Sequence, residues 1–258
     1  MTHQTYADYL RAQQYADGSN LNARIRIHQL YSTNPIGLPR WIFDHIQLPA
    51  QADILEVGCG VGNQWLSVHE LIPPGWNLTL TDFSAGILAE ARKNLHGKIP
   101  NVRYQEADAQ ELPFPDASFD AIVANHMLYH VPDRPKAFAE FRRVLRPGGK
   151  LYAATNGRHH MTALYAWADR FGLDTASVAA VAFRVGSFSL ENGAEQLAAY
   201  FQDVQLFSYQ DALEITDAYP LIDYVASILP ADILEENLHK IEAFKQWIDE
   251  QISIQSSV

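Results

Sequence analysis

The chain has 258 residues, of which 48% are hydrophobic and 19% charged, as in globular proteins that bury a core of their own. Nineteen Lys and Arg residues against 30 Asp and Glu give a formal charge of −11, which argues against a protein that neutralises nucleic-acid phosphates. One cysteine, Cys59, excludes an intramolecular disulfide and a cysteine metal cluster. Without a long apolar run or a secretory pattern at the start, the expected location is the cytoplasm.

The first 50 residues predict two helices, at residues 21–30 and 38–46. Within the first helix, Arg24, His28 and Tyr31 have spacings of i, i+4 and i+7, so they share one face. Two interpretations remain open for that face. It either forms a wall of a ligand pocket or is simply solvated.

A strand, a glycine loop and a helix follow. The apolar run Ile54–Val57 predicts a buried strand, which passes at once into three glycines on alternate positions, Gly58, Gly60 and Gly62. Residues 63–72 predict a helix, because apolar residues recur there at helical spacing before two prolines and a glycine. A corner of this kind is typical of a ligand-binding loop.

Short strands and amphipathic helices alternate up to residue 155. Ser84 and Asp133 are predicted to begin the two helices of this region. Because short connections join strands to helices in alternation, we expect a parallel sheet with helices on both faces. Strands are predicted at residues 78–81, 102–107, 121–125 and 150–155.

Residues 158–186 interrupt the alternation. Apolar residues at helical spacing predict a helix that Gly172 closes, and a second short helix is predicted at residues 175–183. Asn192 begins a further helix with a capping-box pattern. A late strand is expected at residues 201–208.

The last part of the chain is predicted to be extended and then helical. Residues 211–216 are an extended neighbour of the late strand. The tail from Tyr219 is helical, with one apolar face that includes Leu234, Leu238 and Ile241. We interpret that face as packing surface rather than a partner-binding site.

Three blocks of the sequence share their spacing with a known family. The first is E-x-G-x-G-x-G from Glu56 to Gly62, with Asp82 at the end of the second strand. The second runs from Asp108 to Asp120 and reads D-A-Q-E-L-P-F-P-D-A-S-F-D. The third is the helix-to-strand junction at residues 143–151. Together they resemble the class I S-adenosylmethionine-dependent methyltransferases, in particular the branch of the ubiquinone and menaquinone biosynthesis C-methyltransferases.

The resemblance implies an α/β fold with a Rossmann-like sheet. That sheet is mostly parallel, has seven strands and carries helices on both faces, with helical caps at the N-terminus and after the fifth strand. We expect a single methyltransferase domain. Its parts are an N-terminal helical lid at 1–50, a cofactor-binding core at 51–157, a cap insertion at 158–200, and the last strands and C-terminal helices at 201–258.

The resemblance also implies the cofactor, S-adenosyl-L-methionine, which leaves as S-adenosyl-L-homocysteine. In that family the glycine loop passes beside the amino-acid half of the cofactor, and the acid after the second strand binds the ribose hydroxyls. The aspartate equivalent to Asp108 accepts from the adenine amino group, and the next backbone amide meets a ring nitrogen. The residues so assigned are Glu56, Gly58, Cys59, Gly60, Asn63, Asp82, Phe83, Asp108, Ala109, Asn125 and Tyr31.

The segment after the fourth strand lies where the family places the methyl group. Histidine accepts protons near neutrality, so His126 and His130 are candidate catalytic bases. Alternatively both are structural, and alignment of the reactants alone suffices. The neighbours His159 and His160 cannot share one helix face, so no metal site is predicted. The candidate substrate-binding residues are His28, Tyr129, His159, His160 and Tyr165.

The leading hypothesis is methyl transfer by in-line displacement to an O, N or C atom of a small molecule. The expected partners are that acceptor and, at most, a second copy of the chain, with no nucleic acid and no membrane span. One alternative is a quinone-ring C-methyltransferase, and another is a cofactor-binding regulatory protein without turnover. An NAD-linked oxidoreductase is disfavoured, because Asn63 stands where the dinucleotide fingerprint needs its third glycine or alanine.

Overall fold

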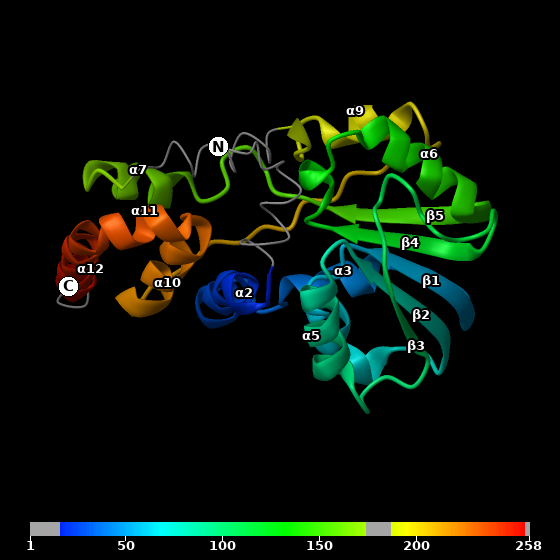
Figure 1. The fold of residues 1–258 in the computed structure, drawn as a ribbon, viewed down its shortest axis with the longest axis horizontal. Coiled ribbons are helices and arrows are strands. Elements are labelled where there is room, and N and C mark those ends of the chain that lie inside the picture. Colours follow the sequence, from blue (N-terminus) through cyan, green and yellow to red (C-terminus); the bar gives the residue numbers. More distant parts are fainter. Residues whose placement is uncertain (1–15, 174–186, 256–258) are drawn as a thin grey trace. The chain divides into compact units, whose positions relative to one another are not determined.

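The computed structural model describes residues 16–173 and 187–255. The chain forms two compact units, and each is described here by itself (Figure 1). The first unit consists of Met1–Gly37, His159–Phe183 and Gln210–Val258, and the second of Leu38–Arg158 and Arg184–Tyr209.

The second unit is built on a parallel sheet, as predicted. Among the described residues this sheet has five strands instead of the seven expected, in the order β3-β2-β1-β4-β5, and all four pairings are parallel. The apolar run at the start of the glycine motif lies in the central strand, so the motif leaves the middle of the sheet. The strands are β1 (Gln51–Val57), β2 (Gly75–Asp82), β3 (Val102–Glu106), β4 (Phe119–Asn125) and β5 (Leu145–Ala154).

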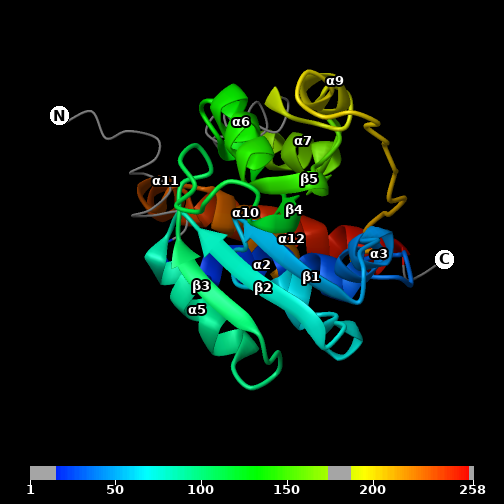
Figure 2. The ribbon, with the colours of Figure 1, turned by 90° about the vertical axis from the view of Figure 1, so that its right-hand side faces the viewer.

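Helices cover both faces of this sheet (Figure 1). On one face α5 (Ala85–Leu95) lies alongside β2 and β3 (Figure 2) and buries Ile87, Leu88, Ala91 and Leu95. The same core contains residues of α3 (Leu38–His45) and α4 (Asn63–Leu66). On the other face α6 (Arg134–Val144) buries its apolar side. Ser84 and Asp133 cap α5 and α6 by accepting backbone N–H groups, as predicted.

Three boundaries differ from the predictions. The helix expected at residues 63–72 is only α4 followed by a 3-10 turn, η2 (His69–Leu71), because Val68 leaves the helical conformation to bury its side chain. The strand β5 begins at Leu145, directly after α6. The helix α9 (Gly193–Ala198) begins after Asn192, as predicted, but the Asn192 side chain accepts from Ser189 N instead of capping the helix.

The strand predicted at residues 201–208 is wrong, and the extended segment predicted beside it, at residues 211–216, pairs elsewhere. Leu206 and Phe207 are more than half exposed, and the first segment forms no ladder. The second segment belongs to the first unit, where Leu213 makes one antiparallel bridge with Ser32. A strand requires a neighbouring backbone for its ladder, and residues 201–208 have none among the described residues.

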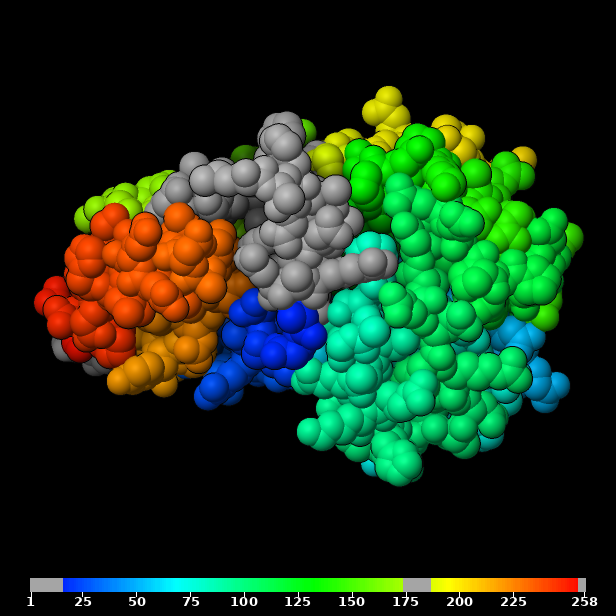
Figure 3. Space-filling view, in the orientation of Figure 1, coloured from blue at the N-terminus to red at the C-terminus, as the bar shows by residue number. Residues whose placement is uncertain are grey.

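The first unit is helical. The apolar face predicted for the tail is buried at Ile241, Phe244 and Ile248, whereas Leu238 is exposed because a new helix starts there. Figure 3 shows α10, α11 and α12, gold to red, packed against one another. The described helices are α2 (Ser19–Tyr31), α7 (Thr162–Arg170), α10 (Ala218–Ile228), α11 (Ala231–Glu236) and α12 (Leu238–Gln255).

The predicted helix at residues 175–183 lies outside the described residues. Arg24 in α2 donates to the backbone oxygen and the hydroxyl of Ser227 in α10. This side of α2 is therefore packed rather than solvated. Within residues 16–173 and 187–255, we find no helix with the length and apolarity needed to cross a bilayer.

Candidate functional site

The glycine loop after β1 depends on backbone conformations that favour glycine. Gly58, Gly60 and Gly62 have φ angles of 71°, 54° and 78°. A Cβ atom on Gly58 would lie 2.7 Å from the Cβ of Met127. The loop is also tied to β2, since Cys59 N donates to Thr81 O at 2.8 Å. The motif thus shapes a tight turn at the carboxyl edge of the sheet.

Two buried acids lie beneath this loop. Glu56 is 2% exposed and accepts a hydrogen bond from Trp65 Nε1 at 2.7 Å. Asp82 accepts from the backbone N–H groups of Gly60 and Ser84, both at 3.0 Å. Burial raises the pKa of both carboxyl groups, that of Glu56 to about 8. Within the described part of the chain, neither acid has a Lys or Arg partner.

Asn125, at the end of β4, carries an unsatisfied acceptor. Its Nδ2 donates to Gln64 Oε1 at 3.3 Å, but its Oδ1 is buried and has no hydrogen-bond partner. A buried amide oxygen without a donor costs about 1–3 kcal/mol. Such an atom calls for a donor that the described residues do not supply, such as a ligand or an ordered water.

After β3, Asp108 is oriented by the residue two positions later. Its Oδ1 accepts from the backbone N–H of Gln110 at 2.8 Å, and the Gln110 side-chain amide donates to both carboxylate oxygens, at 3.0 and 3.1 Å. Between them lies Ala109, 5% exposed, whose N–H donates to no group in the described residues. This loop therefore offers an acceptor and a donor side by side.

Residues 55–153 match the family described as "Methyltransferase domain". This segment contains the glycine loop and all of the acidic and amide groups above. Residues 55–153 are a class I S-adenosylmethionine-dependent methyltransferase domain. The predicted resemblance is thereby confirmed for this part of the chain.

Curated relatives of the methyltransferase domain point to the same branch. The ubiquinone/menaquinone biosynthesis C-methyltransferase of Hahella chejuensis is 35% identical over 127 residues, which is 48% of each chain. That of Proteus mirabilis is 37% identical over 100 residues, 38% of this chain and 40% of the relative. The chain therefore spans about half the length of these relatives or less. Among solved structures, phosphoethanolamine N-methyltransferase 2 of Haemonchus contortus is 26% identical, with a TM-score of 0.48 over 57% of this chain and 34% of that one.

The structure brings most of the predicted cofactor residues to one edge of the methyltransferase sheet. Since its strands are parallel, their carboxyl ends share that edge, where ligands of such sheets bind. The residues are Glu56, ending β1 with Val57; Gly58, Cys59, Gly60 and Asn63, following β1; Asp82 and Phe83, at the end of β2; Asp108 and Ala109, after β3; and Asn125, at the end of β4. Burial raises the pKa of the Cys59 thiol well above its ordinary value, which agrees with a packing role.

The candidate bases lie in the loop after β4. His126 has a φ of 54°, an uncommon conformation for a residue other than glycine, and its N–H donates to Ala154 O. His130 closes a short 3-10 turn, η3 (Leu128–His130), and its ring meets that of Tyr129 with centroids 4.5 Å apart. Their catalytic role stays a prediction.

Of the predicted substrate-binding residues, Tyr129 lies in the second unit and its role stays a prediction, whereas the others belong to the first unit. His28 and His160 stack with ring centroids 5.9 Å apart, and burial lowers the pKa of His28. Burial likewise raises the pKa of Tyr165, which is hydrogen-bonded to Tyr224. His159 is exposed. Substrate binding by these residues, and cofactor binding by Tyr31, stay predictions.

Four residues of the site were missed from the sequence. Trp65 was read as one position of an apolar helix face, although its indole N–H binds Glu56. Gln64 gave no signal, because its contacts with Pro39 and Asn125 join separate segments and leave no local pattern, and Gln110, two residues from Asp108, was assigned no role. Met127 beneath Gly58 gave none either.

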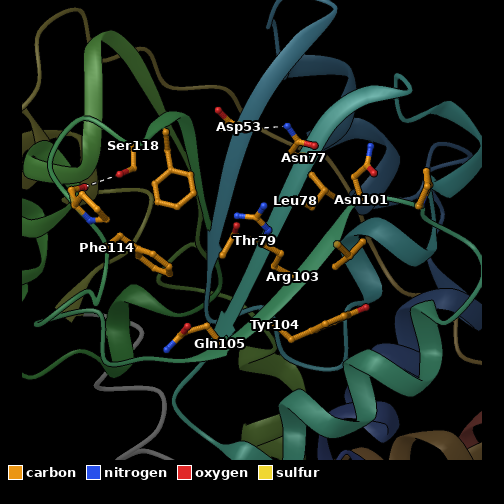
Figure 4. Close-up of a pocket in the computed structure, with 14 residues that line it drawn as sticks. Asp53, Asn77, Leu78, Thr79, Asn101, Arg103, Tyr104, Gln105, Phe114 and Ser118 are labelled. Carbon is orange, nitrogen blue, oxygen red and sulfur yellow. Dashed lines mark hydrogen bonds between the residues drawn. The ribbon is translucent and has the colours of Figure 1, made fainter.

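A separate hollow of about 570 Å³ opens over the face of β2 and β3 that turns away from α5 (Figure 4). Its lining includes Asn77, Thr79, Arg103 and Gln105, and Asn77 donates to Asp53 at 2.9 Å. The Asp108–Asp120 block contributes Phe114, Pro115, Ser118 and Phe119 to this lining, but none of the predicted cofactor residues lines it. We therefore place the functional site at the carboxyl edge of the sheet.

Glu56 is expected to make the stability of the fold depend on pH. The unfolded carboxyl group loses its proton near its ordinary pKa of 4.5, whereas the folded one keeps it up to about 8. In that range the folded state binds more protons, so the free energy of unfolding falls as pH rises, by about 1.4 kcal/mol per pH unit for one such group. Urea unfolding at several pH values between these limits measures the slope.

The matched variant is Glu56→Gln, which keeps an oxygen for Trp65 but cannot titrate. Its free energy of unfolding should depend less steeply on pH than that of the wild type. Asp82, whose pKa is also raised, leaves a residual slope of the same sign. Parallel curves for the two proteins would show that Glu56 titrates normally in the fold.

Proposed function

We propose that the whole chain transfers a methyl group from S-adenosyl-L-methionine to a small-molecule acceptor. The observation that carries the proposal is a pair of buried acids, Glu56 and Asp82, without a cationic partner in the described residues. The cofactor has a sulfonium and an ammonium group, so it supplies positive charge. A dinucleotide would instead add the negative charge of its diphosphate beside two acids.

The spare hydrogen-bonding capacity of the edge supports the same cofactor. The Asp82 carboxylate has about four acceptor positions, of which three take the backbone N–H groups of Gly60, Phe83 and Ser84, so one remains for a ribose hydroxyl. Asp108 keeps a position on Oδ2 for the adenine amino group, and the Ala109 N–H is a donor for a ring nitrogen. Gly58 and Gly60 let the backbone approach the amino-acid half.

When bound, the cofactor supplies an electrophilic methyl group on a positively charged sulfur. The protein then has to hold the acceptor in line, exclude water and take up a proton where the acceptor carries one. His126 and His130 are the proposed bases, because they follow β4 at the cofactor edge. Replacing each by Ala should lower turnover and leave the affinity for S-adenosyl-L-homocysteine unchanged; full activity in both variants would leave alignment as the mechanism.

Thermal unfolding with added ligands tests the cofactor. S-Adenosyl-L-homocysteine at about 100 times its Kd should add about 2.7 kcal/mol to the free energy of unfolding, because it binds only the folded state. The melting temperature should rise accordingly, and NADH at the same concentration should not change it. A rise with NADH and none with S-adenosyl-L-homocysteine would reject the proposal.

A quinone-ring acceptor is the second candidate. It is favoured by the names of the curated relatives, which are 35–37% identical over the matched segments. Incubation with a methyl-labelled cofactor and a panel of phenols, amines and quinols, followed by mass spectrometry, distinguishes O, N and C transfer. Activity as one methyltransferase domain, in the cytoplasm, as a monomer or homodimer, stays a prediction.

A further inference from the structure

The unsatisfied acceptor of Asn125 lies on the same face of the sheet as Glu56. Along β4, Ala121 and Val123 pack in the core that contains α3, α4 and α5, and alternation puts Asn125 on their side. Glu56 of β1 lies beside Val123 in the sheet register. Its side chain accepts a hydrogen bond from Trp65, which belongs to the same core. Asn125 is thus two residues nearer the carboxyl edge than Glu56, on the neighbouring strand.

The direction of the Asn125 amide is set by a chain of hydrogen bonds that begins in α3. Gln64 Nε2 donates to the backbone oxygen of Pro39 at 2.8 Å. A carbonyl oxygen can only accept, so Gln64 must turn its Oε1 towards Asn125. Asn125 must then present Nδ2 to Gln64, and its Oδ1 is left as the outward acceptor. Reversing either amide would bring two donors or two acceptors together.

We propose that Gln64 is a positioning residue that holds Asn125 as an acceptor for the α-ammonium group of the cofactor, with Glu56 as the acid of the same subsite. The Asn125 oxygen requires a donor, and the buried Glu56 has no Lys or Arg partner among the described residues, so an ammonium group can donate to the first and replace the proton of the second with positive charge. The ionised α-carboxylate has no proton to donate to Asn125. This inference rests on the proposed function, because it assumes that the amino-acid half of the cofactor lies at the glycine loop.

The test compares two ligands that differ by the ammonium group alone. These are S-adenosyl-L-homocysteine and its deaminated analogue, 5′-S-(3-carboxypropyl)-5′-thioadenosine, with Kd values measured by calorimetry. Wild-type protein should prefer the amine by about 10-fold or more, as expected for hydrogen bonds to a charged group. In Gln64→Leu and in Asn125→Leu that preference should shrink to a few-fold. Asn125→Asp keeps an acceptor oxygen and should keep the preference.

Gln110→Leu is the matched control. It also removes a glutamine, which is half-buried where Gln64 is buried and which contacts Asp108 at the proposed adenine end. It should weaken the binding of both ligands equally and leave the ratio of their Kd values unchanged. Urea unfolding checks that each variant is folded, and Asn125→Leu and Asn125→Asp decide the question should Gln64→Leu fail to fold.

The outcomes separate the two proposals. An unchanged amine preference in Asn125→Leu, or an equal loss of preference in Gln110→Leu, would overturn the positioning role. If wild-type protein binds neither ligand, the proposed function itself fails. Loss of preference confined to the Gln64→Leu and Asn125→Leu variants, with rescue in Asn125→Asp, supports both.

Discussion

Replacing Asp82 by Ala should weaken binding of S-adenosyl-L-homocysteine by about 1–3 kcal/mol, or roughly 5- to 150-fold in Kd. Asp82 is proposed to bind a ribose hydroxyl, and it also holds the glycine loop by accepting from Gly60 N and Ser84 N. The substitution removes both functions, and it leaves buried donors unpaired. Calorimetric titration well below the melting temperature measures the affinity.

Asp53→Ala is the control for this prediction. Asp53 is also an acid on a central strand, but it lies near the amino end of β1, where it binds Asn77 and Arg146. Its loss should lower the free energy of unfolding and leave the ligand affinity unchanged. Equal loss of affinity in both variants would mean that the effect of Asp82→Ala comes from general destabilisation.

Gly58→Ala should lower the free energy of unfolding by about 2–5 kcal/mol. An L-residue at a φ of 71° costs about 1–2 kcal/mol. The new Cβ would also lie 2.7 Å from the Cβ and 2.9 Å from the Cγ of Met127, and overpacking of this kind costs about 1–3 kcal/mol. Since whole domains are stable by only about 5–15 kcal/mol, urea unfolding should detect the change readily.

Gly97→Ala separates the two causes. Gly97 has a φ of 72°, but a Cβ there would meet nothing within 4 Å, so only the backbone cost applies. In addition, Met127→Ala should restore part of the stability in the Gly58→Ala background, since it removes the Cγ at 2.9 Å and keeps only the Cβ at 2.7 Å. Equal losses at Gly58 and Gly97 would rule out a contribution from Met127.

The strands and helix starts of the methyltransferase core could be predicted because each depends on neighbouring residues. Ile54–Val57 is an apolar run of strand length, and Ser84 and Asp133 are capping residues directly before amphipathic segments. The glycine loop was predictable as well, because alternate glycines indicate positive φ angles. Because the strands are parallel, the motif acids at the ends of β1 and β2 and after β3 were expected to lie at the same edge of the sheet.

Contacts between distant segments could not be predicted in this way. The pairing of Trp65 with Glu56, and the path from Pro39 through Gln64 to Asn125, join residues whose local patterns predict only helix or loop. The late strand predicted at residues 201–208 failed for the same reason. Within the described residues, the segment around Leu213 makes a single bridge, to Ser32.

The single thiol of the chain gives the glycine loop a built-in reporter. Cys59 is 6% exposed, and its raised pKa keeps it protonated at neutral pH, so an alkylating reagent reaches it only when this turn opens. The rate of labelling therefore reads the local opening of the loop alone, free of signal from any other cysteine. No engineered probe has to be introduced to follow how a ligand closes this corner of the molecule.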